Sequence, residues 1–335
     1  MPQSITAPVL RWWMVLALAL AGPALAQVQV QVQAQVHEQP IALPTPTGSI
    51  AGTLALPSAA GRVPVVLIIA GSGPTDRDGN NAAMRNDSLR LVATALADAG
   101  FAAVRYDKRG IGASFAAAPD ESALRFDAYV DDAAAWIAQL KADARFTRVV
   151  VLGHSEGALI GMPAARRAGA DAYISVAGIA DGIGVILRRQ LAGKLTPGLA
   201  AANERILASL ESGATVTEVP GPLMGLYRSS VQLYLISAMR YRPVEEMAAL
   251  PTPMPVLIVQ GTTDIQVGVD QAQRLKAARP DATLAILPGM NHVLKAVPAD
   301  QVRQLASYND PALPLAPQLA ETIVGFLRGL AAAQR

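Results

Sequence analysis

The 335-residue sequence has no cysteine, which excludes disulfides, thiolate metal sites, a thiol nucleophile and a lipid-modified cysteine near the N-terminus. Histidine is nearly as scarce, with three in the whole chain. The formal net charge is only +2 and the basic residues are scattered, so no surface for nucleic acid is expected. The hydrophobic share of 52% is nevertheless enough for a substantial core and excludes a disordered protein.

A glycine-rich phosphate loop is also missing. The stretch "AGSGPTDRDGN", residues 70–80, has neither the lysine spacing of a P-loop nor a Gly-x-Gly-x-x-Gly that opens a helix. A bound nucleotide is therefore not expected, and we expect no other cofactor and no metal.

The N-terminal 26 residues have the pattern of an export signal peptide. Arg11 supplies positive charge, residues 12–22 form an unbroken apolar run, and residues 24–26, "ALA", match a small-x-small cleavage site. We expect cleavage after Ala26 and an exported protein, periplasmic or extracellular. The apolar segment is shorter than the roughly 20 residues that span a bilayer, so no stable membrane anchor is expected after cleavage. Residues 27–40 are interpreted as a low-complexity spacer outside the fold, with an added edge strand as the alternative for residues 27–36.

From residue 41 to residue 335, strand-like and helix-like patterns alternate, which predicts one α/β domain with a mainly parallel sheet covered by helices. Almost eighty residues separate two of the strands, too many for a loop, and they contain helical patterns. We expect residues 180–250 to be a helical lid insertion over the carboxyl edge of the sheet, its tyrosines and methionines, such as Tyr234, packing rather than lining a pocket. The predicted strands are 49–56, 63–70, 101–106, 148–152, 172–177, 256–260 and 283–287, the first two forming an antiparallel edge, and the predicted helices are 87–99, 127–141, 156–168, 269–278 and 314–331.

The run "RVVVLGHSEGALIG", residues 148–161, carries the main chemical signal. A buried strand passes directly into a helix, and the single linking residue, Ser155, must then adopt a strained backbone. Gly153 and Gly157 remove the side chains that would collide in so tight a turn. This geometry lifts the Ser155 hydroxyl clear of the sheet beside the first N–H groups of the helix and makes it a candidate nucleophile.

A serine nucleophile needs a base, and histidine is the usual one near neutral pH. His37 falls in the predicted spacer, and the ring of His154 is expected to point away from Ser155. His292, just after the predicted strand 283–287, lies at the same edge of the sheet as Ser155. His292 is therefore the candidate base.

The imidazole in turn needs a carboxylate to orient it. Asp264 follows the predicted strand 256–260 at this edge and is favoured, with Asp181 as the alternative. The order Ser155, Asp264, His292 along the chain is the order expected for such a triad on this kind of sheet.

Three features resemble the α/β-hydrolase superfamily: the strand–turn–helix around Gly153–Gly157, called the nucleophile elbow, the helical insertion, and the order of Ser155, Asp264 and His292. The resemblance covers about residues 45–332 and is strongest to the bacterial esterase and serine-aminopeptidase-like branch. The blocks "AGSGPTDRDGN" and "RYDKRGIGAS" are also similar to that branch. The resemblance implies that the backbone N–H groups of Glu156 and Ser72 form the oxyanion hole. Asp107, Arg109 and Gly112 are expected to brace the loop that holds Ser72 rather than contact substrate. For Asp76, Arg77 and Asp78, two alternatives stay open: recognition of substrate or a hydrogen-bonded loop.

These features together predict an exported serine hydrolase that cleaves carboxylic esters through an acyl-enzyme. Its expected partner is a small-molecule ester or a short peptide, with no nucleic acid. Two alternatives stay open: a serine aminopeptidase-like peptidase, which needs a buried carboxylate for the substrate's amino group, and a non-catalytic binding protein on the same fold. Members of the superfamily that open epoxides or remove halides have aspartate at the position of Ser155, so the serine argues against both reactions.

Overall fold

The computed structural model describes residues 36–58 and 61–332. The predicted signal peptide and residues 27–35 of the predicted spacer lie outside these ranges. The strands are β1 His37–Thr45, β2 Gly48–Leu56, β3 Val63–Ile69, β4 Ala102–Tyr106, β5 Phe146–His154, β6 Ala172–Val176, β7 Val256–Gly261 and β8 Thr283–Leu287. The helices are α1 Ser88–Asp98, α2 Phe126–Ala142, α3 Glu156–Ala168, α4 Ile183–Leu191, α5 Pro197–Glu211, α6 Met224–Tyr227, α7 Ser229–Ala238, α8 Pro243–Ala248, α9 Val269–Ala278, α10 Gln301–Ser307 and α11 Pro317–Ala332, with short 3-10 turns η1 Gly112–Ala117, η2 Glu121–Ala123 and η3 Gly221–Leu223.

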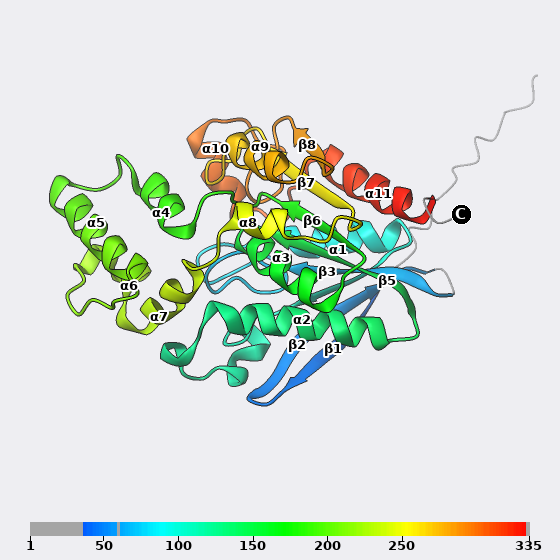
Figure 1. Ribbon diagram of the computed structural model, residues 1–335. Coiled ribbons are helices and arrows are strands. Elements are labelled where there is room, and N and C mark those ends of the chain that lie inside the picture. The colour runs from blue at the N-terminus through cyan, green and yellow to red at the C-terminus, as the bar shows by residue number, and fades with distance from the viewer. Residues whose placement is uncertain (1–35, 59–60, 333–335) are drawn as a thin grey trace, which may run out of the picture. The chain divides into compact units, whose positions relative to one another are not determined.

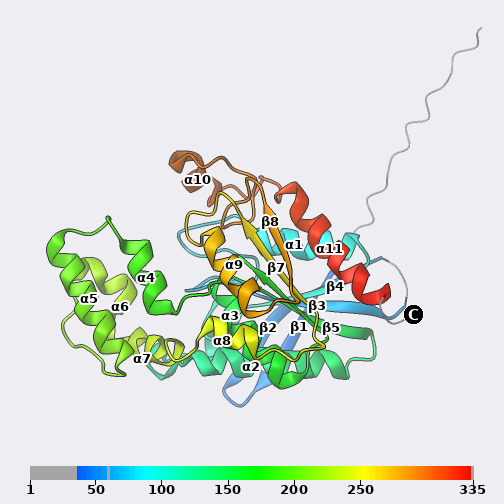
Figure 2. The same cartoon turned by 45° about the horizontal axis from the view of Figure 1, so that its top comes forward.

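The strands form one sheet in the order β1-β2-β4-β3-β5-β6-β7-β8 (Figure 1). From β4 to β8 all neighbours are parallel, whereas β2 runs antiparallel to both β1 and β4. The central strand β3 is wholly apolar, and β5 is apolar from Val149 to Leu152, because helices cover both of their faces. Helices α1 and α11 pack on one face and α2, α3, α8 and α9 on the other, as Figure 2 shows from a second direction. The predicted α/β-hydrolase fold is confirmed.

The N-terminal edge of the sheet differs from the prediction. Strand β1 begins at His37, inside the segment interpreted as a spacer, and pairs with β2 along its whole length. Its side chains alternate between exposed and more buried positions down to Leu43, which is buried. Pro40 and Pro44 resemble strand breakers, but an edge strand tolerates proline because one side of its backbone needs no partner. The predicted antiparallel pairing of β2 with β3 is also wrong, because β3 lies between β4 and β5.

The long interval between β6 and β7 contains the helices α4 to α8, and its role as a lid stays a prediction. It has a small apolar cluster of its own, which includes Ile206, Leu210 and Tyr227. Residues 223–241 have a helical pattern, and the chain forms two helices there, α6 and α7, which are separated at Arg228, a residue with non-helical dihedrals. Helix α7 packs against η2 and α2 and so connects the insertion to the rest of the domain. Among the described helices, none is both long and apolar enough to cross a membrane.

Candidate active site

Ser155 is the single residue between β5 and α3, and its backbone is strained. Its φ of 55° lies in a region that residues with a side chain rarely adopt. The two flanking glycines explain how the chain tolerates this turn. A Cβ on Gly153 would collide with the carbonyl oxygen of Gly157, and a Cβ on Gly157 would collide with the carbonyl oxygen of Ile69. The sharp turn is therefore built by close backbone packing that only glycine allows.

Asp264 and His292 meet at the carboxyl edge of the sheet, in the loops after β7 and β8. His292 Nδ1 lies 2.8 Å from Asp264 Oδ2. The other oxygen of Asp264 accepts the backbone N–H groups of Gln266 and Val267 at 2.8 and 2.9 Å. Gln260 Nε2, 3.1 Å from Asp264 Oδ2, adds a further donor. The carboxylate is thus held in one orientation against the imidazole.

The charge of Asp264 is maintained although its side chain is only 1% exposed. Burial alone would raise its pKa, but His292 and the N–H groups of Val267 and Gln266 outweigh burial and hold the pKa below its usual value. Because a carboxylate only accepts hydrogen bonds, Nδ1 of His292 carries the proton in this pair. The neutral ring then keeps its free electron pair at Nε2, where a base needs it.

Ser155 lies between two cavities. Ser155 and His292 line the first, of about 60 Å³, which we call the histidine cavity. Ser155 also lines a second cavity of about 310 Å³, which we call the insertion cavity because Ile183, Ile186 and Leu235 of the insertion form much of its wall. Ser72 lines both cavities. The structure therefore brings the candidate nucleophile, the candidate base and one predicted oxyanion donor to a common space.

The predicted oxyanion residues lie on either side of this space. Glu156 is the first residue of α3, so its N–H has no partner within the helix, and the Ser155 side chain does not cap this end. The Ser72 loop is held by Lys108, whose buried ammonium donates to the carbonyl oxygens of Gly71 and Gly73. These are the residues immediately before and after Ser72. Lys108 thereby fixes the peptide groups that flank the predicted donor.

Lys108 also faces the side chain of Glu156, with Nζ 3.9 Å from Oε2. Burial disfavours both charges, so the pKa of Lys108 is lowered and the pKa of Glu156 is raised, while their attraction opposes both shifts. In the sequence, the neighbours of Lys108 stand out as loop-bracing residues, whereas Lys108 itself does not. A lysine next to charged residues gives no sequence signal of burial.

His154 is a second residue whose position the sequence did not reveal. Its Nε2 lies 2.8 Å from the carbonyl oxygen of His292, and the two rings are 5.0 Å apart between centroids. Because a carbonyl only accepts, His154 Nε2 carries a proton. Burial, together with the nearby His292, lowers the pKa of His154 to about 4, so the ring is neutral at pH 7. His154 supports the loop that carries His292.

The other acidic candidates have different partners. Asp181, the alternative to Asp264, binds Arg189, Arg274 and Gln271. Asp107 accepts the side chain and the backbone N–H of Arg77 and so braces the loop after β3, as expected.

That loop also contains Asp76 and Asp78. Asp76 accepts backbone N–H groups of its own loop, and Asp78 binds Arg105. Within the part of the chain that the structure describes, no group of three or more His, Cys, Asp or Glu side chains forms a possible metal site.

The chain is similar to known proteins in sequence and in fold. Residues 86–296 match the family described as serine aminopeptidase, S33. Esterase EstD of Thermotoga maritima is 29% identical over 249 residues, which cover 73% of this chain and 58% of that protein. The chain thus spans little more than half the length of this curated relative.

Two solved structures show the same fold. Est1E from Butyrivibrio proteoclasticus, solved with ferulic acid bound, has a TM-score of 0.59 at 19% identity and covers 87% of this chain and 99% of its own. The α/β hydrolase GrgF from Penicillium sp. sh18 has a TM-score of 0.58 at 18% identity, over 89% and 100% of the two chains. With the family match over most of the domain and the fold in agreement, the chain belongs to the serine aminopeptidase S33 family of α/β hydrolases.

Proposed function

We propose that this protein is a serine hydrolase that cleaves carboxylic esters through an acyl-enzyme. The observation that carries the proposal is the hydrogen-bonded pair of Asp264 and His292 beside the cavity that Ser155 and His292 line together. Similarity to an esterase of Thermotoga maritima supports the same reaction class.

In the proposed mechanism, Ser155 Oγ attacks the ester carbonyl while His292 Nε2 takes its proton. The N–H groups of Ser72 and Glu156 stabilise the negative charge on the carbonyl oxygen, a contribution of about 3–4 kcal/mol per donor in related sites. The bond to the alkoxide then breaks and His292 gives its proton to the leaving alcohol. In the second half, His292 removes a proton from water, the hydroxide attacks the acyl-enzyme, and the proton returns to Ser155 as the acid leaves.

Peptidase action is the second candidate, because the family name refers to aminopeptidases. An aminopeptidase needs a carboxylate that receives the substrate's ammonium group. Among the described residues that line the insertion cavity, Glu156 is the one carboxylate, and it already faces Lys108. The insertion's Glu204 and Glu211 both bind Arg188. An ester also loses its leaving group more readily than an amide, so we favour the esterase.

Short p-nitrophenyl esters and aminoacyl-anilides distinguish these activities. We expect the purified protein to hydrolyse the esters well and the anilides poorly, and Ser155→Ala to remove both activities. A fluorophosphonate should label Ser155 in the wild-type protein. Efficient anilide turnover with poor ester turnover would replace the esterase by the peptidase, and an unlabelled, inactive but folded protein would favour a binding protein.

We also propose that the protein acts outside the cytoplasm, in the periplasm or beyond it. The support is the charged, apolar and small-residue pattern of residues 1–26. Mass spectrometry of the protein expressed in a Gram-negative host should find a mature chain that begins at Gln27 in the periplasmic or external fraction. A full-length chain confined to the cytosol would contradict this proposal.

A further inference from the structure

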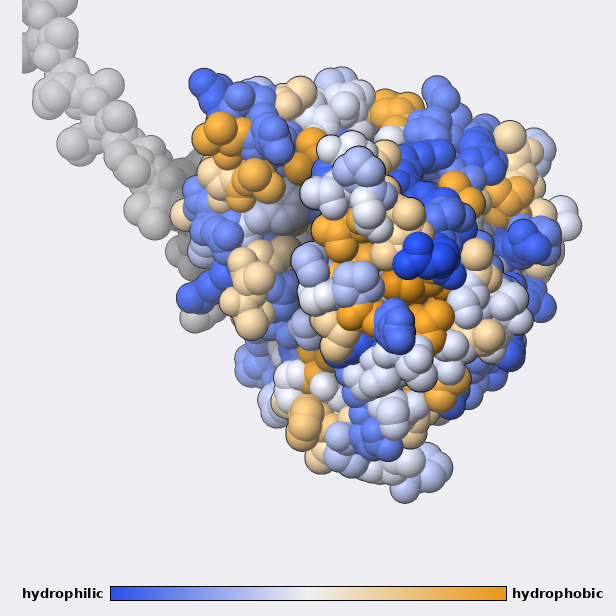
Figure 3. All heavy atoms as spheres, turned by 90° about the vertical axis from the view of Figure 1, so that its left-hand side faces the viewer, coloured by the Kyte–Doolittle hydropathy of each residue, from blue (hydrophilic) through white to orange (hydrophobic). Residues whose placement is uncertain are grey.

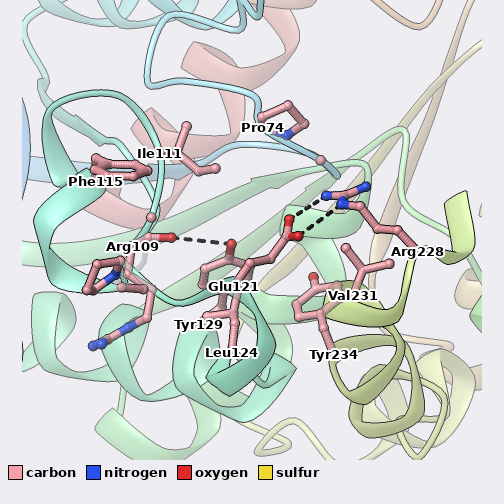
Figure 4. Close-up of a pocket in the computed structure, with 14 residues that line it drawn as sticks. Pro74, Arg109, Ile111, Phe115, Glu121, Leu124, Tyr129, Arg228, Val231 and Tyr234 are labelled. Atoms are coloured by element: carbon pink, nitrogen blue, oxygen red, sulfur yellow. Dashed lines mark hydrogen bonds and ion pairs between the residues drawn. The ribbon is translucent and has the colours of Figure 1, made fainter. Parts of the chain in front are cut away.

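A third cavity adjoins the insertion cavity and has no role in the mechanism above. It has a volume of about 340 Å³, and we call it the distal chamber (Figure 4). The segment with η1 and η2 forms one wall and helix α7 of the insertion forms the opposite one. Most of its lining is apolar or aromatic: Ile111, Phe115, Leu124, Tyr129, Val231 and Tyr234.

The distal chamber shares part of its wall with the insertion cavity, which Ser155 lines. Both this chamber and the insertion cavity are lined by Gly73, Pro74, Arg228, Val231 and Tyr234. A group bound to Ser155 that extends through the insertion cavity therefore meets the distal chamber at a shared wall. Hydrophobic side chains also gather in the middle of the face that carries the insertion, as Figure 3 shows.

The charged groups of the distal chamber are already paired within the protein. Glu121 binds the guanidinium of Arg228, and Ser230 donates to the same carboxylate. These hydrogen bonds, first of all those from Arg228, lower the pKa of Glu121. Arg109 binds Asp132 with its guanidinium, which Figure 4 shows directed away from the chamber. A ligand therefore meets neutralised charges and three aromatic rings.

The position of His292 indicates which half of an ester faces this space. His292 must protonate the leaving alcohol, and it lines the small histidine cavity but not the insertion cavity. The leaving alcohol is therefore placed on the histidine side. The acyl group then extends into the insertion cavity, towards the distal chamber.

We infer that the distal chamber binds the far end of the substrate's acyl group, and that this end is an uncharged aromatic or bulky apolar group. The inference rests on the proposed esterase activity and deepens it by giving the substrate class. Burial of such a group in an apolar pocket is worth about 1.5–3 kcal/mol, or roughly 10- to 100-fold in binding or in kcat/KM.

The test is a series of p-nitrophenyl esters with one leaving group and varied acyl groups: acetate, and phenyl-terminated acyl chains of increasing length. We expect kcat/KM to rise about tenfold or more once the phenyl group is long enough to reach the distal chamber. A chain of the same length that ends in a carboxylate should give no such gain. A preference for the carboxylate-ended chain, or a flat series, would overturn the inference.

A matched pair of variants locates the effect. Ala118, just after η1, lines the distal chamber, whereas the exposed Ala116, two residues earlier within η1, does not. Ala118→Trp fills the chamber and should remove the gain from the phenyl group while acetate turnover changes less than about twofold. Ala116→Trp should keep the wild-type profile. Equal profiles for the two variants would place the phenyl group elsewhere.

A binding measurement separates this inference from the esterase proposal. In a Ser155→Ala background, calorimetry with the phenyl-terminated ester should show a Kd at least about fivefold weaker when Ala118→Trp is added. If ester turnover depends on Ser155 but Ala118→Trp has no effect in either experiment, the binding role of the distal chamber is rejected and the esterase proposal is kept. An inactive wild-type protein that still shows the Kd difference would reject the esterase and keep the chamber.

Discussion

The carboxyl edge of the sheet and the helical insertion contribute to the candidate site in different ways. At the sheet edge, polar groups are fixed by several partners each: Asp264 accepts four hydrogen bonds, and Lys108 ties the loop on both sides of Ser72. The insertion contributes mainly apolar side chains, and ion pairs such as that of Arg188 are partly exposed. From this division we propose that the sheet edge determines whether reaction occurs and the insertion determines which acyl group is accepted.

Among the residues that hold the nucleophile, the base and the oxyanion loop in position, the largest effect is expected for Asp264→Asn. The amide cannot stabilise a charged imidazole and favours the wrong tautomer, so kcat should fall by roughly 10³- to 10⁴-fold for short and long acyl esters alike. The matched control is Asp181→Asn. Asp181 is also a largely buried carboxylate, but it is paired with Arg189 and Arg274 rather than with His292. Steady-state kinetics with both variants decide between the two carboxylates. A loss for Asp181→Asn that equals the loss for Asp264→Asn would contradict the assignment.

A smaller effect is expected for Lys108→Met, which frees the carbonyl groups of Gly71 and Gly73. The Ser72 N–H would lose its fixed orientation, and we expect kcat to fall by roughly 10- to 100-fold with little change in KM. Because Glu156 would lose its partner, the double variant with Glu156→Gln tests the position of the loop without an unpaired charge. In the control, Lys141→Met removes a lysine that also donates to a carbonyl oxygen, that of Gly169, on the surface.

Kinetics with several acyl esters also test whether the sheet edge and the insertion act independently. Variants of Lys108 should scale the turnover of all acyl esters by the same factor, because the oxyanion is common to them. A Lys108 variant that changed the preference between acetate and a phenyl-terminated acyl group would mean that the two regions are not separate in function.

The smallest effect on turnover is expected for His154→Gln, which should instead change how the free energy of unfolding depends on pH. The pKa of His154 is about 4 in the folded protein and about 6.5 in an unfolded chain. Between these values the unfolded state binds more protons, so the free energy of unfolding falls as the pH is lowered. From pH 7 to pH 4.5 the loss from this residue is about 2 kcal/mol.

The variant His154→Gln should lose less stability than the wild type over this pH range, because an amide does not titrate and can still donate to the carbonyl oxygen of His292. Urea unfolding of both proteins at the two pH values measures the difference. Parallel losses of stability in the two proteins would mean that His154 is not the titrating group.

Much of the fold and of the candidate site could be predicted from sequence because parallel strands constrain where their following loops lie. The strands that end before Ser155, Asp264 and His292 all finish at one edge, so residues far apart in the chain could be placed together. The helix 156–168 was predicted with its observed bounds because a strained turn precedes it and Gly169 ends it in a left-handed conformation.

Other features depend on tertiary contacts that leave no periodic pattern. Lys108 is buried because the loop of residues 71–73 and helix α3 surround it. The edge strand β1 could not be recognised from its sequence because it contains two prolines, which are unusual in strands. Tyr234 is expected from the sequence to pack, but it lines both the insertion cavity and the distal chamber. Such features require the fold to be known.

In the proposed mechanism, Ser155 becomes acylated because His292, held by Asp264, takes its proton. Rapid quenching of the reaction with p-nitrophenyl acetate, followed by peptide mass spectrometry, tests it most directly. We predict an acetyl group on the peptide that contains Ser155 in the wild-type protein, and a rate of acetylation reduced by roughly 10⁴-fold or more in His292→Gln. Acetyl transfer to another residue, or an unchanged rate in His292→Gln, would contradict the account.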